Sequence, residues 1–245
     1  MLQTLHRLKS PRILSLQQHL STPTRFMAET LFTQAQKDKI FFPTKPGQDP
    51  RPNFFVSFRI TDPTLANTIA THVQQILPQG YHRDLVPREK YHVTLHVFYA
   101  ASEEAVRRAV PVVHDICQRL QGSLNPPPIT FQRVFKFNPR GALALIAVND
   151  PQHVLEACRD ELRKRLGEIQ GIVFTDELRN FERDYNPHVT VVKVDQRTGL
   201  NWVPEGNNTL FGSQDFAHIE LCQMSSVGVN GRGYRALHNE DLTQQ

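Results

Sequence analysis

The feature that most constrains the fold is a short pattern, His-Val-Thr, which occurs at residues 92–94 and again at residues 188–190. Each copy lies in a run rich in apolar and β-branched residues, which is typical of a β-strand. Side chains alternate between the two faces of a strand, so the histidine and threonine of each copy share one face. The pattern therefore predicts two strands that each present an imidazole and a hydroxyl, with an apolar back that enters the core.

Helix and strand patterns alternate around these two copies. Apolar residues at helical spacing, after Asp-Pro start signals, predict one helix before each copy. The surroundings of the two copies match, so we expect an α+β fold of bilobal, duplicated build, with two antiparallel sheets flanked by helices around a central cleft. The expected strands are 54–60, 91–99, 129–137, 142–148, 188–194 and 216–224, a weaker segment lies at 227–237, and the expected helices are 63–77, 102–120 and 151–166.

The N-terminal region differs in composition from the rest of the chain. Residues 1–28 hold four basic and no acidic side chains, which equals the net charge of +4 of the whole chain. The remainder is electrically balanced and does not indicate a general nucleic-acid binder. Four prolines within residues 43–52 predict a linker. We therefore expect residues 1–52 to be a basic leader and Pro-rich linker, either disordered or a transit peptide, and residues 53–240 to be the domain.

The composition also limits where the protein functions. No apolar run approaches the roughly 18 residues of a membrane span. Cys117, Cys158 and Cys222 are odd in number and far apart, which indicates a reducing, intracellular setting in which they are buried as small apolar residues. The expected location is the cytoplasm or the nucleus, and the alternative is the mitochondrion, reached through the basic leader.

The two imidazoles and two hydroxyls suit phosphodiester chemistry. Neutral imidazole accepts a proton from water or a ribose hydroxyl, and imidazolium gives one to the departing oxygen, because the ordinary histidine pKa lies near neutrality. Threonine hydroxyls donate hydrogen bonds to phosphate oxygens on which charge develops. His92 and His188 are therefore the candidate catalytic residues, and Thr94 and Thr190 the candidate phosphate contacts. The sequence does not assign which histidine is the acid and which the base.

A metal site is the main alternative at the first copy. His92 and His96 lie four residues apart, but Val93 stands where the helical metal motif needs glutamate. On a strand, His96 either lines the cleft as a third polar group or is a partly exposed strand residue. The sequence also has no Gly-rich phosphate loop or serine nucleophile motif. We therefore expect no metal and no cofactor.

The paired motifs resemble those of the two-histidine (2H) phosphoesterase superfamily. Residues 51–60, Asn186–Thr190 and 218–224 are similar to the branch that contains the phosphoesterase domain of A-kinase anchoring protein 7, and the resemblance covers residues 51–238. The resemblance implies a bilobal fold, a central cleft without a metal, and catalytic roles for both histidines. It also implies substrates with a phosphoester at a ribose 2′ position, such as 2′,5′-linked oligoadenylates, 2′,3′-cyclic phosphates or RNA ends.

The sequence thus predicts a metal-independent phosphodiesterase acting on a ribose 2′-phosphoester, either an oligoribonucleotide or a cyclic-phosphate nucleotide. The alternatives are a nucleotide (AMP)-binding sensor or scaffold with little turnover, and an RNA-end trimming nuclease. We see no kinase-anchoring helix after the domain, and we expect a monomer. The candidates for contact with the base are Phe135, Lys136, Tyr185 and Tyr234, each of which could instead be a core or surface residue.

Overall fold

The computed structural model describes residues 31–41, 49–124, 127–136, 143–174, 185–195, 199–202, 208–216, 218–224 and 234–241. Its helices are α1 (Gln34–Ile40), α2 (Pro63–Ile76), α3 (Glu103–Leu124) and α4 (Val154–Gly167), with short 3-10 helices η1 (Gln79–Asp84) and η2 (Arg88–Lys90). Its strands are β1 (Phe54–Arg59), β2 (His92–Ala100), β3 (Ile129–Lys136), β4 (Leu143–Asn149), β5 (Ile172–Val173), β6 (His188–Lys193), β7 (Leu210–Gln214), β8 (His218–Gln223) and β9 (Arg235–Asp241). The expected α+β class is confirmed.

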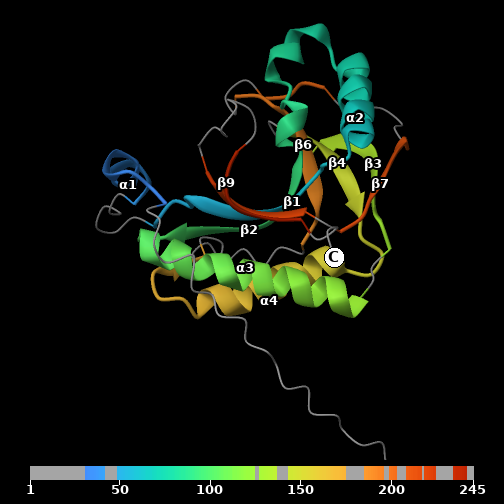
Figure 1. Ribbon diagram of the computed structural model, residues 1–245. Helices are drawn as coiled ribbons and strands as arrows, with labels where there is room; N and C mark the ends of the chain where they lie inside the picture. Colours follow the sequence, from blue (N-terminus) through green and yellow to red (C-terminus); the bar gives the residue numbers. More distant parts are fainter. Residues whose placement is uncertain are drawn as a thin grey trace, which may run out of the picture. The chain divides into compact units, whose positions relative to one another are not determined.

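The strands within the described residues form one antiparallel sheet (Figure 1). Its hydrogen-bonded path runs β7-β3-β4-β6-β2-β1-β8-β9, and the short strand β5 pairs with β2. The prediction of two separate sheets was wrong in this respect, because β6 and β2 join the two groups of four strands into a single path. The duplication into two lobes stays a prediction. The two strands with the His-Val-Thr pattern are thus neighbours in the middle of the sheet.

Helix α2 begins where the sequence predicted. The Asp62 carboxylate accepts hydrogen bonds from the backbone N–H groups of Thr64, at 2.7 Å, and Leu65, at 3.4 Å, and Pro63 occupies the first turn. Helix α4 begins later than predicted, at Val154. There the Asp150 carboxylate accepts from the N–H groups of Val154, at 2.9 Å, and Leu155, at 2.7 Å, so it satisfies the helix start from outside the helix.

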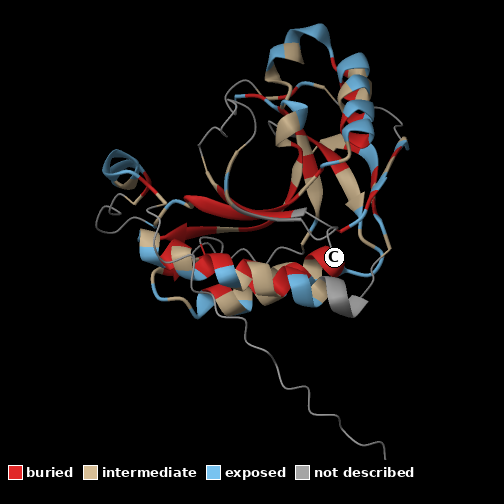
Figure 2. Ribbon diagram, in the orientation of Figure 1, coloured by how far each residue is buried: buried red, intermediate tan, exposed pale blue. Residues whose placement is uncertain are grey.

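Helices α3 and α4 run side by side beneath β1 and β2, whereas α2 lies at the end of the molecule that holds β3, β4 and β7 (Figure 1). Their buried positions face inward (Figure 2). All three cysteines are buried and free, as predicted. Among the helices that the structure describes, none combines the length and the apolar character needed to cross a bilayer.

The packed part of the chain begins before the Pro-rich segment. Phe32 is 1% exposed and belongs to the core, with its ring centroid 6.1 Å from that of Phe54. The Leu31 N–H donates to the Glu103 carboxylate at 2.8 Å. The sequence placed all of residues 1–52 outside the domain, but residues 31–41 pack against it. The leader before Leu31 and residues 42–48 lie outside the described residues.

Several elements were not expected from the sequence. Strand β7 has an exposed Leu210 and a central glycine, and β9 follows a glycine-rich stretch, so neither shows a clear alternation of apolar residues. Both are completed by pairing with a longer neighbour, β7 with β3 and β9 with β8. Most of the weak segment expected at 227–237 lies outside the described residues.

Candidate active site

The two His-Val-Thr patterns meet where β2 and β6 adjoin. Val93 pairs with Val189 in antiparallel register, and both side chains are fully buried. Because paired residues share a face and alternate along the strands, both histidines and both threonines lie on the opposite face. The register puts His92 across from Thr190 and His188 across from Thr94. His92 and His188 are thus diagonal neighbours across the two strands, and such neighbours are roughly 7–8 Å apart. A bound phosphate group can bridge this separation.

The two histidines have the same local geometry. The Nδ1 atom of His92 lies 2.7 Å from the carbonyl oxygen of Lys90, and that of His188 lies 2.8 Å from the carbonyl oxygen of Asn186. A carbonyl oxygen only accepts, so Nδ1 carries the hydrogen in both rings. When either ring is neutral, Nε2 is therefore the nitrogen that can accept a proton. The matched backbone contacts, each to the residue two positions before, hold both imidazoles in the tautomer that acid–base chemistry needs.

The threonines lie beside the histidines and are half-buried. The backbone of Thr94 is held from the other motif, because the Tyr185 hydroxyl donates to the Thr94 carbonyl oxygen at 3.2 Å. Tyr185 precedes His188 by three residues, so this hydrogen bond links the lead-in of β6 to β2. Thr94 and Thr190 thus lie on the same face of the sheet as the two histidines.

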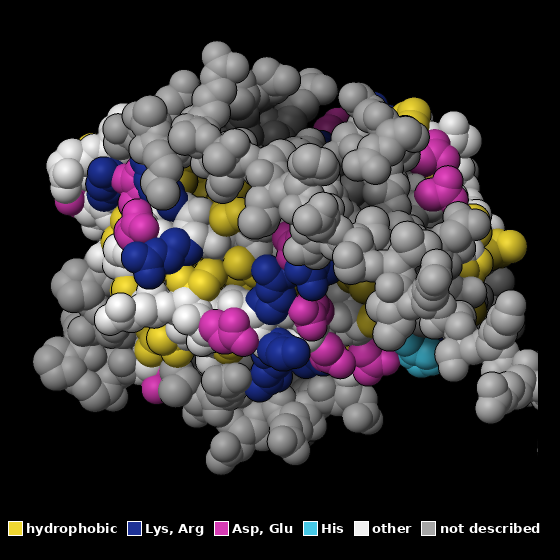
Figure 3. All heavy atoms as spheres, turned by 60° about the horizontal axis from the view of Figure 1, so that its bottom comes forward, with side chains coloured by type: hydrophobic (Ala, Val, Ile, Leu, Met, Phe, Trp, Pro, Cys, Tyr) yellow, Lys and Arg dark blue, Asp and Glu magenta, His cyan; other side chains and the backbone are white. Residues whose placement is uncertain are grey.

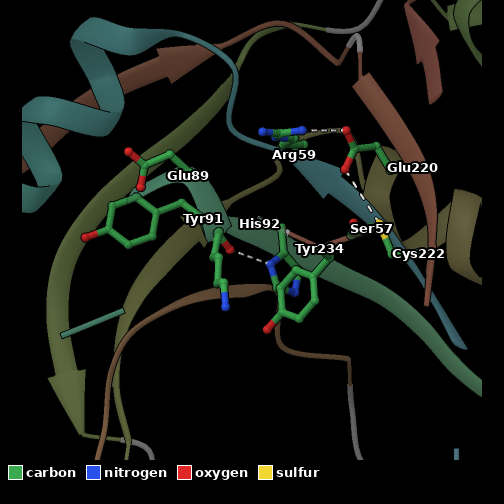
Figure 4. Close-up of a pocket in the computed structure, with 9 residues that line it drawn as sticks. Ser57, Arg59, Glu89, Tyr91, His92, Glu220, Cys222 and Tyr234 are labelled. Carbon is green, nitrogen blue, oxygen red and sulfur yellow. Dashed lines mark hydrogen bonds and ion pairs between the residues drawn. The ribbon is translucent and has the colours of Figure 1, made fainter. Parts of the chain in front are cut away.

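A pocket of about 220 Å³, its open mouth included, lies beside His92. Figure 4 shows Tyr234 against the His92 ring and Arg59 meeting Glu220 on the side of Cys222. Glu89 and Tyr91 lie on the other side (Figure 4). The pocket is lined by Ser57, Arg59, Glu89, Lys90, Tyr91, His92, Glu220, Cys222 and Tyr234, which come from β1, η2, β2, β8 and the start of β9. It thus opens on the β1–β8 side of the catalytic candidates.

The electrostatic surroundings of His92 favour its neutral form. Burial lowers the pKa of His92 below its ordinary value, and the positive charges of His188 and Arg59 lower it further. The Lys90 carbonyl and the Glu220 carboxylate oppose this effect. Arg59 Nη1 and Glu220 Oε1 form an ion pair at 2.8 Å, in which the Glu220 side chain is only 7% exposed. That His188 acts electrostatically on His92 agrees with the closeness implied by the strand register.

His96 lies elsewhere, and both interpretations of it were wrong. The β1–β2 register shifts so that Ser57 pairs with Thr94 but Val56 pairs with His96, which leaves Leu95 as the extra residue of a β-bulge. The bulge turns His96 to the core face, where it is 3% exposed and its ring centroid lies 4.3 Å from that of Phe174. His96 therefore neither lines the pocket nor reaches the surface.

The four candidates for base contact have different surroundings. Tyr234 lines the pocket, with its ring centroid 5.4 Å from that of His92. Phe135 is half-buried and lies in the cross-strand row Phe135–Leu145–Thr190, two strands from β6 on the same face as Thr190. Tyr185 holds Thr94 as described above, and the Lys136 ammonium donates to the Leu200 carbonyl oxygen. Tyr234 and Phe135 thus remain on the face of the site, on opposite sides of it.

The sequence analysis missed Ser57, Arg59 and Glu220. A signal was available, because Ser57 and Arg59 stand two apart in the otherwise apolar run Phe54–Ile60, and Glu220 interrupts the apolar residues of β8. Polar residues at a period of two mark one face of a strand. For Lys90, which lies in η2, no comparable signal exists. Within the described ranges, no group of three or more His, Cys, Asp or Glu side chains has the closeness of a metal site.

The family model described as the AKAP7 2′5′ RNA ligase-like domain matches residues 52–242. A search of curated proteins found no match.

Solved structures share the fold at low sequence identity. Escherichia coli LigT, in a complex with 3′-AMP, is 18% identical with a TM-score of 0.53, and the match covers 79% of this chain and 99% of LigT. The TT0787 protein of Thermus thermophilus is 19% identical with a TM-score of 0.54, and 78% of this chain and 97% of that chain are covered. A structure titled only as a phosphoesterase is 17% identical with a TM-score of 0.56, and 80% and 100% are covered.

Proposed function

This chain belongs to the family of the AKAP7 2′5′ RNA ligase-like domain, and we propose that it is a phosphodiesterase of the 2H phosphoesterase superfamily that hydrolyses ribose 2′-phosphoesters by two-histidine acid–base catalysis without a metal. The preferred substrates are 2′,5′-linked oligoadenylates, with 2′,3′-cyclic phosphates next. The observation that carries the proposal is the joint of β2 and β6, where the register puts His92, Thr94, His188 and Thr190 on one face. The bilobal, duplicated cleft belongs to the same proposal.

In the proposed reaction, His92 is the base and His188 the acid. His92 Nε2 takes a proton from water as the water oxygen attacks phosphorus. The bond from phosphorus to the departing ribose oxygen then breaks, and His188 gives its Nε2 proton to that oxygen. The Thr94 and Thr190 hydroxyls donate to the non-bridging phosphate oxygens as negative charge builds up on them.

The assignment of the base is supported by the surroundings of the two rings. The lowered pKa of His92 keeps this ring neutral and able to accept a proton near neutral pH. His188 lies in a more open position, next to the exposed Asn186. After one turnover, His92 holds a proton and His188 lacks one, so exchange with solvent restores the starting state.

The two alternatives are weaker. An AMP-binding sensor requires no acid–base pair, so it leaves the matched Nδ1 contacts of His92 and His188 without a purpose. An RNA-end nuclease with a long groove requires a continuous basic surface. The face below α3 and α4 shows Lys and Arg interleaved with Asp and Glu among the described residues (Figure 3). Arg107–Glu103 and Arg108–Glu104 are ion pairs on α3, so among the described residues the helix side of the molecule, opposite to the face of the histidines, offers no continuous basic surface.

A substrate panel tests the proposed function. The full chain is incubated with 2′,5′-linked and 3′,5′-linked oligoadenylates and with 2′,3′-cyclic AMP, each with and without EDTA. We expect turnover of the 2′,5′ linkage to exceed that of the 3′,5′ linkage and to be unchanged by EDTA. Loss of activity in EDTA that returns with a divalent cation would contradict metal independence. Saturable binding of AMP by calorimetry with no cleavage of any substrate would instead favour the sensor.

A further inference from the structure

The two histidines have different neighbours on the face of the site. On β1, Arg59 pairs in register with His92, and on β4, Ala147 pairs in register with His188. On the outer side of His92 the sheet thus presents a guanidinium, and on the outer side of His188 it presents only a methyl group. The charged side coincides with the pocket lined by Arg59, His92 and Tyr234.

Arg59 is held away from the joint between the two motifs. Its ion-pair partner, Glu220, lies on β8, which is on the far side of β1 from β2. Adjacent strands are spaced about 4.8 Å apart, so the pair directs the guanidinium outward from a phosphate bound between His92 and His188. Glu220 is buried and uses one donor of a group that has five. The Arg59 side chain is 37% exposed, so the contact with Glu220 fixes the guanidinium and leaves its other N–H donors available to a ligand.

A second cation lines the same pocket. The Lys90 carbonyl oxygen accepts from His92 Nδ1, and the Lys90 ammonium lies 5.3 Å from the centroid of the Tyr234 ring. Two carboxylates also line the pocket. Glu220 is compensated by Arg59, and Glu89 lies 3.6 Å from Arg88 and beside Tyr91, away from the Arg59–Glu220 pair (Figure 4). The charges of Arg59 and Glu220 cancel one another, as do those of Arg88 and Glu89, so the wall next to His92 offers a ligand the Lys90 ammonium and the remaining N–H donors of Arg59.

We propose that Arg59 and Lys90 form a subsite for a second phosphate group of the substrate, next to the phosphate whose ester bond is hydrolysed. This inference rests on the proposed function and narrows its substrate class to oligoribonucleotides that carry at least two phosphates. The second phosphate is either the next internucleotide phosphate or a terminal one, since both present the same anionic oxygens to a guanidinium.

The test compares three substrates: a 2′,5′-linked adenylate dimer with one phosphate, the same dimer with a terminal 5′-phosphate, and a trimer without one. We expect kcat/KM for a two-phosphate substrate to exceed that for the plain dimer by about tenfold or more, the usual effect of a hydrogen bond to a charged group. Preference for the trimer or for the 5′-phosphorylated dimer identifies the source of the second phosphate.

The variants are chosen to separate binding from folding. Arg59→Ala leaves Glu220 buried without its partner, so the double variant with Glu220→Gln is made alongside it, and Lys90→Ala separately. Arg108→Ala, on the exposed side of α3, is the matched control. We expect the two-phosphate to one-phosphate ratio of kcat/KM to fall towards one in the Arg59 and Lys90 variants and to be retained in the control. Equal kcat/KM in the unaltered protein, or an unaltered ratio in the double variant, would overturn the inference.

A binding measurement keeps this inference distinct from the proposed function. The same three oligonucleotides are titrated into the His188→Ala variant, with and without the Arg59 and Glu220 substitutions. Tighter binding of the two-phosphate ligands that is lost on substitution supports the subsite even if the unaltered protein cleaves none of them. Equal affinities for all three ligands refute the subsite even if the protein cleaves the 2′,5′ linkage.

Discussion

At the scale of single residues, the site combines two imidazoles with the same backbone contact and different surroundings. His92 is enclosed by Phe55 and Tyr234, whose ring centroids lie 5.2 and 5.4 Å from its own. His188 has Ala147 as its cross-strand neighbour. Both rings carry a hydrogen on Nδ1, but the residues around them differ. Such a difference in surroundings can give two titratable groups of one site the separate roles of base and acid.

The first prediction concerns both histidines. His92→Ala and His188→Ala are each expected to lower kcat by about 10²–10⁴-fold, the usual contribution of a positioned acid or base. Both variants should keep the circular dichroism spectrum of the unaltered protein. His153→Ala is the control, because this histidine is exposed and contacts Glu156 on α4. Full activity in either site variant would end the proposed mechanism.

The second prediction concerns pH. The pKa of His92 is lowered from the ordinary 6.5, mainly by burial, so the base stays neutral in a pH range in which an exposed histidine is protonated. The acid limb of kcat/KM against pH is therefore expected below 6.5. Because the pKa of His92 is lower in the folded chain than in the unfolded chain, the unfolded chain binds this proton more tightly. The contribution of His92 to the free energy of unfolding therefore falls as the pH falls through this range. An NMR titration in which His92 protonates with a midpoint at or above pH 6.5 would contradict this expectation.

At the scale of elements, the β-bulge in β2 has a direct effect on the site. Before the bulge, His92 and Thr94 alternate with Val93 and Leu95. After it, His96 lies on the core face, whereas simple alternation would put it on the face of the pocket. One inserted residue thus keeps a third imidazole out of the site and gives the core a ring that packs on Phe174.

The third prediction concerns the segment before the Pro-rich stretch. Phe32→Ala is expected to lower the free energy of unfolding by about 3–5 kcal/mol, the usual cost of removing a buried phenyl ring from a core. Lys39→Ala, at an exposed position of α1, is the control and is expected to have little effect. Denaturant unfolding of the full chain gives both values. A similar stability for both variants would show that the packing of Phe32 adds nothing to the stability of the fold.

At the scale of the whole molecule, the fold places in one site two strands that are 96 positions apart in the chain. The strands on the β1–β8 side supply charged groups, and those on the β4–β3 side supply Ala147, Leu145 and Phe135. The site is therefore polar on one side of the histidines and mainly apolar on the other. A nucleotide has the same asymmetry between its phosphates and its base.

The fourth prediction concerns the basic leader, for which we keep the two proposals of a disordered tail and a mitochondrial transit peptide. If the leader is a transit peptide, a full chain with a fluorescent tag at its C-terminus gives a mitochondrial signal, whereas a chain that starts at Met27 does not, because it lacks the four basic residues before that position. The measurement is imaging of both chains in the same cells. The same diffuse distribution for both would show that the segment is not a targeting signal.

The sequence by itself determined which side chains share a face of each motif strand. The alternation of a strand is a local property, so His92 with Thr94 and His188 with Thr190 followed from spacing alone. The same rule could have found Ser57 and Arg59 on β1. It failed at His96, because a bulge depends on how β2 pairs with β1 and not on the residues of β2 alone.

Only the tertiary structure decided which strands adjoin. That Val93 pairs with Val189, that Arg59 lies across from His92, and that Glu220 holds Arg59 all depend on registers between segments far apart in the chain. Such registers are selected by the packing of whole strands and helices around a shared core, and no local pattern carries that information. For this reason the sequence predicted the two candidate catalytic histidines, whereas the charged pocket beside His92 was found only in the fold.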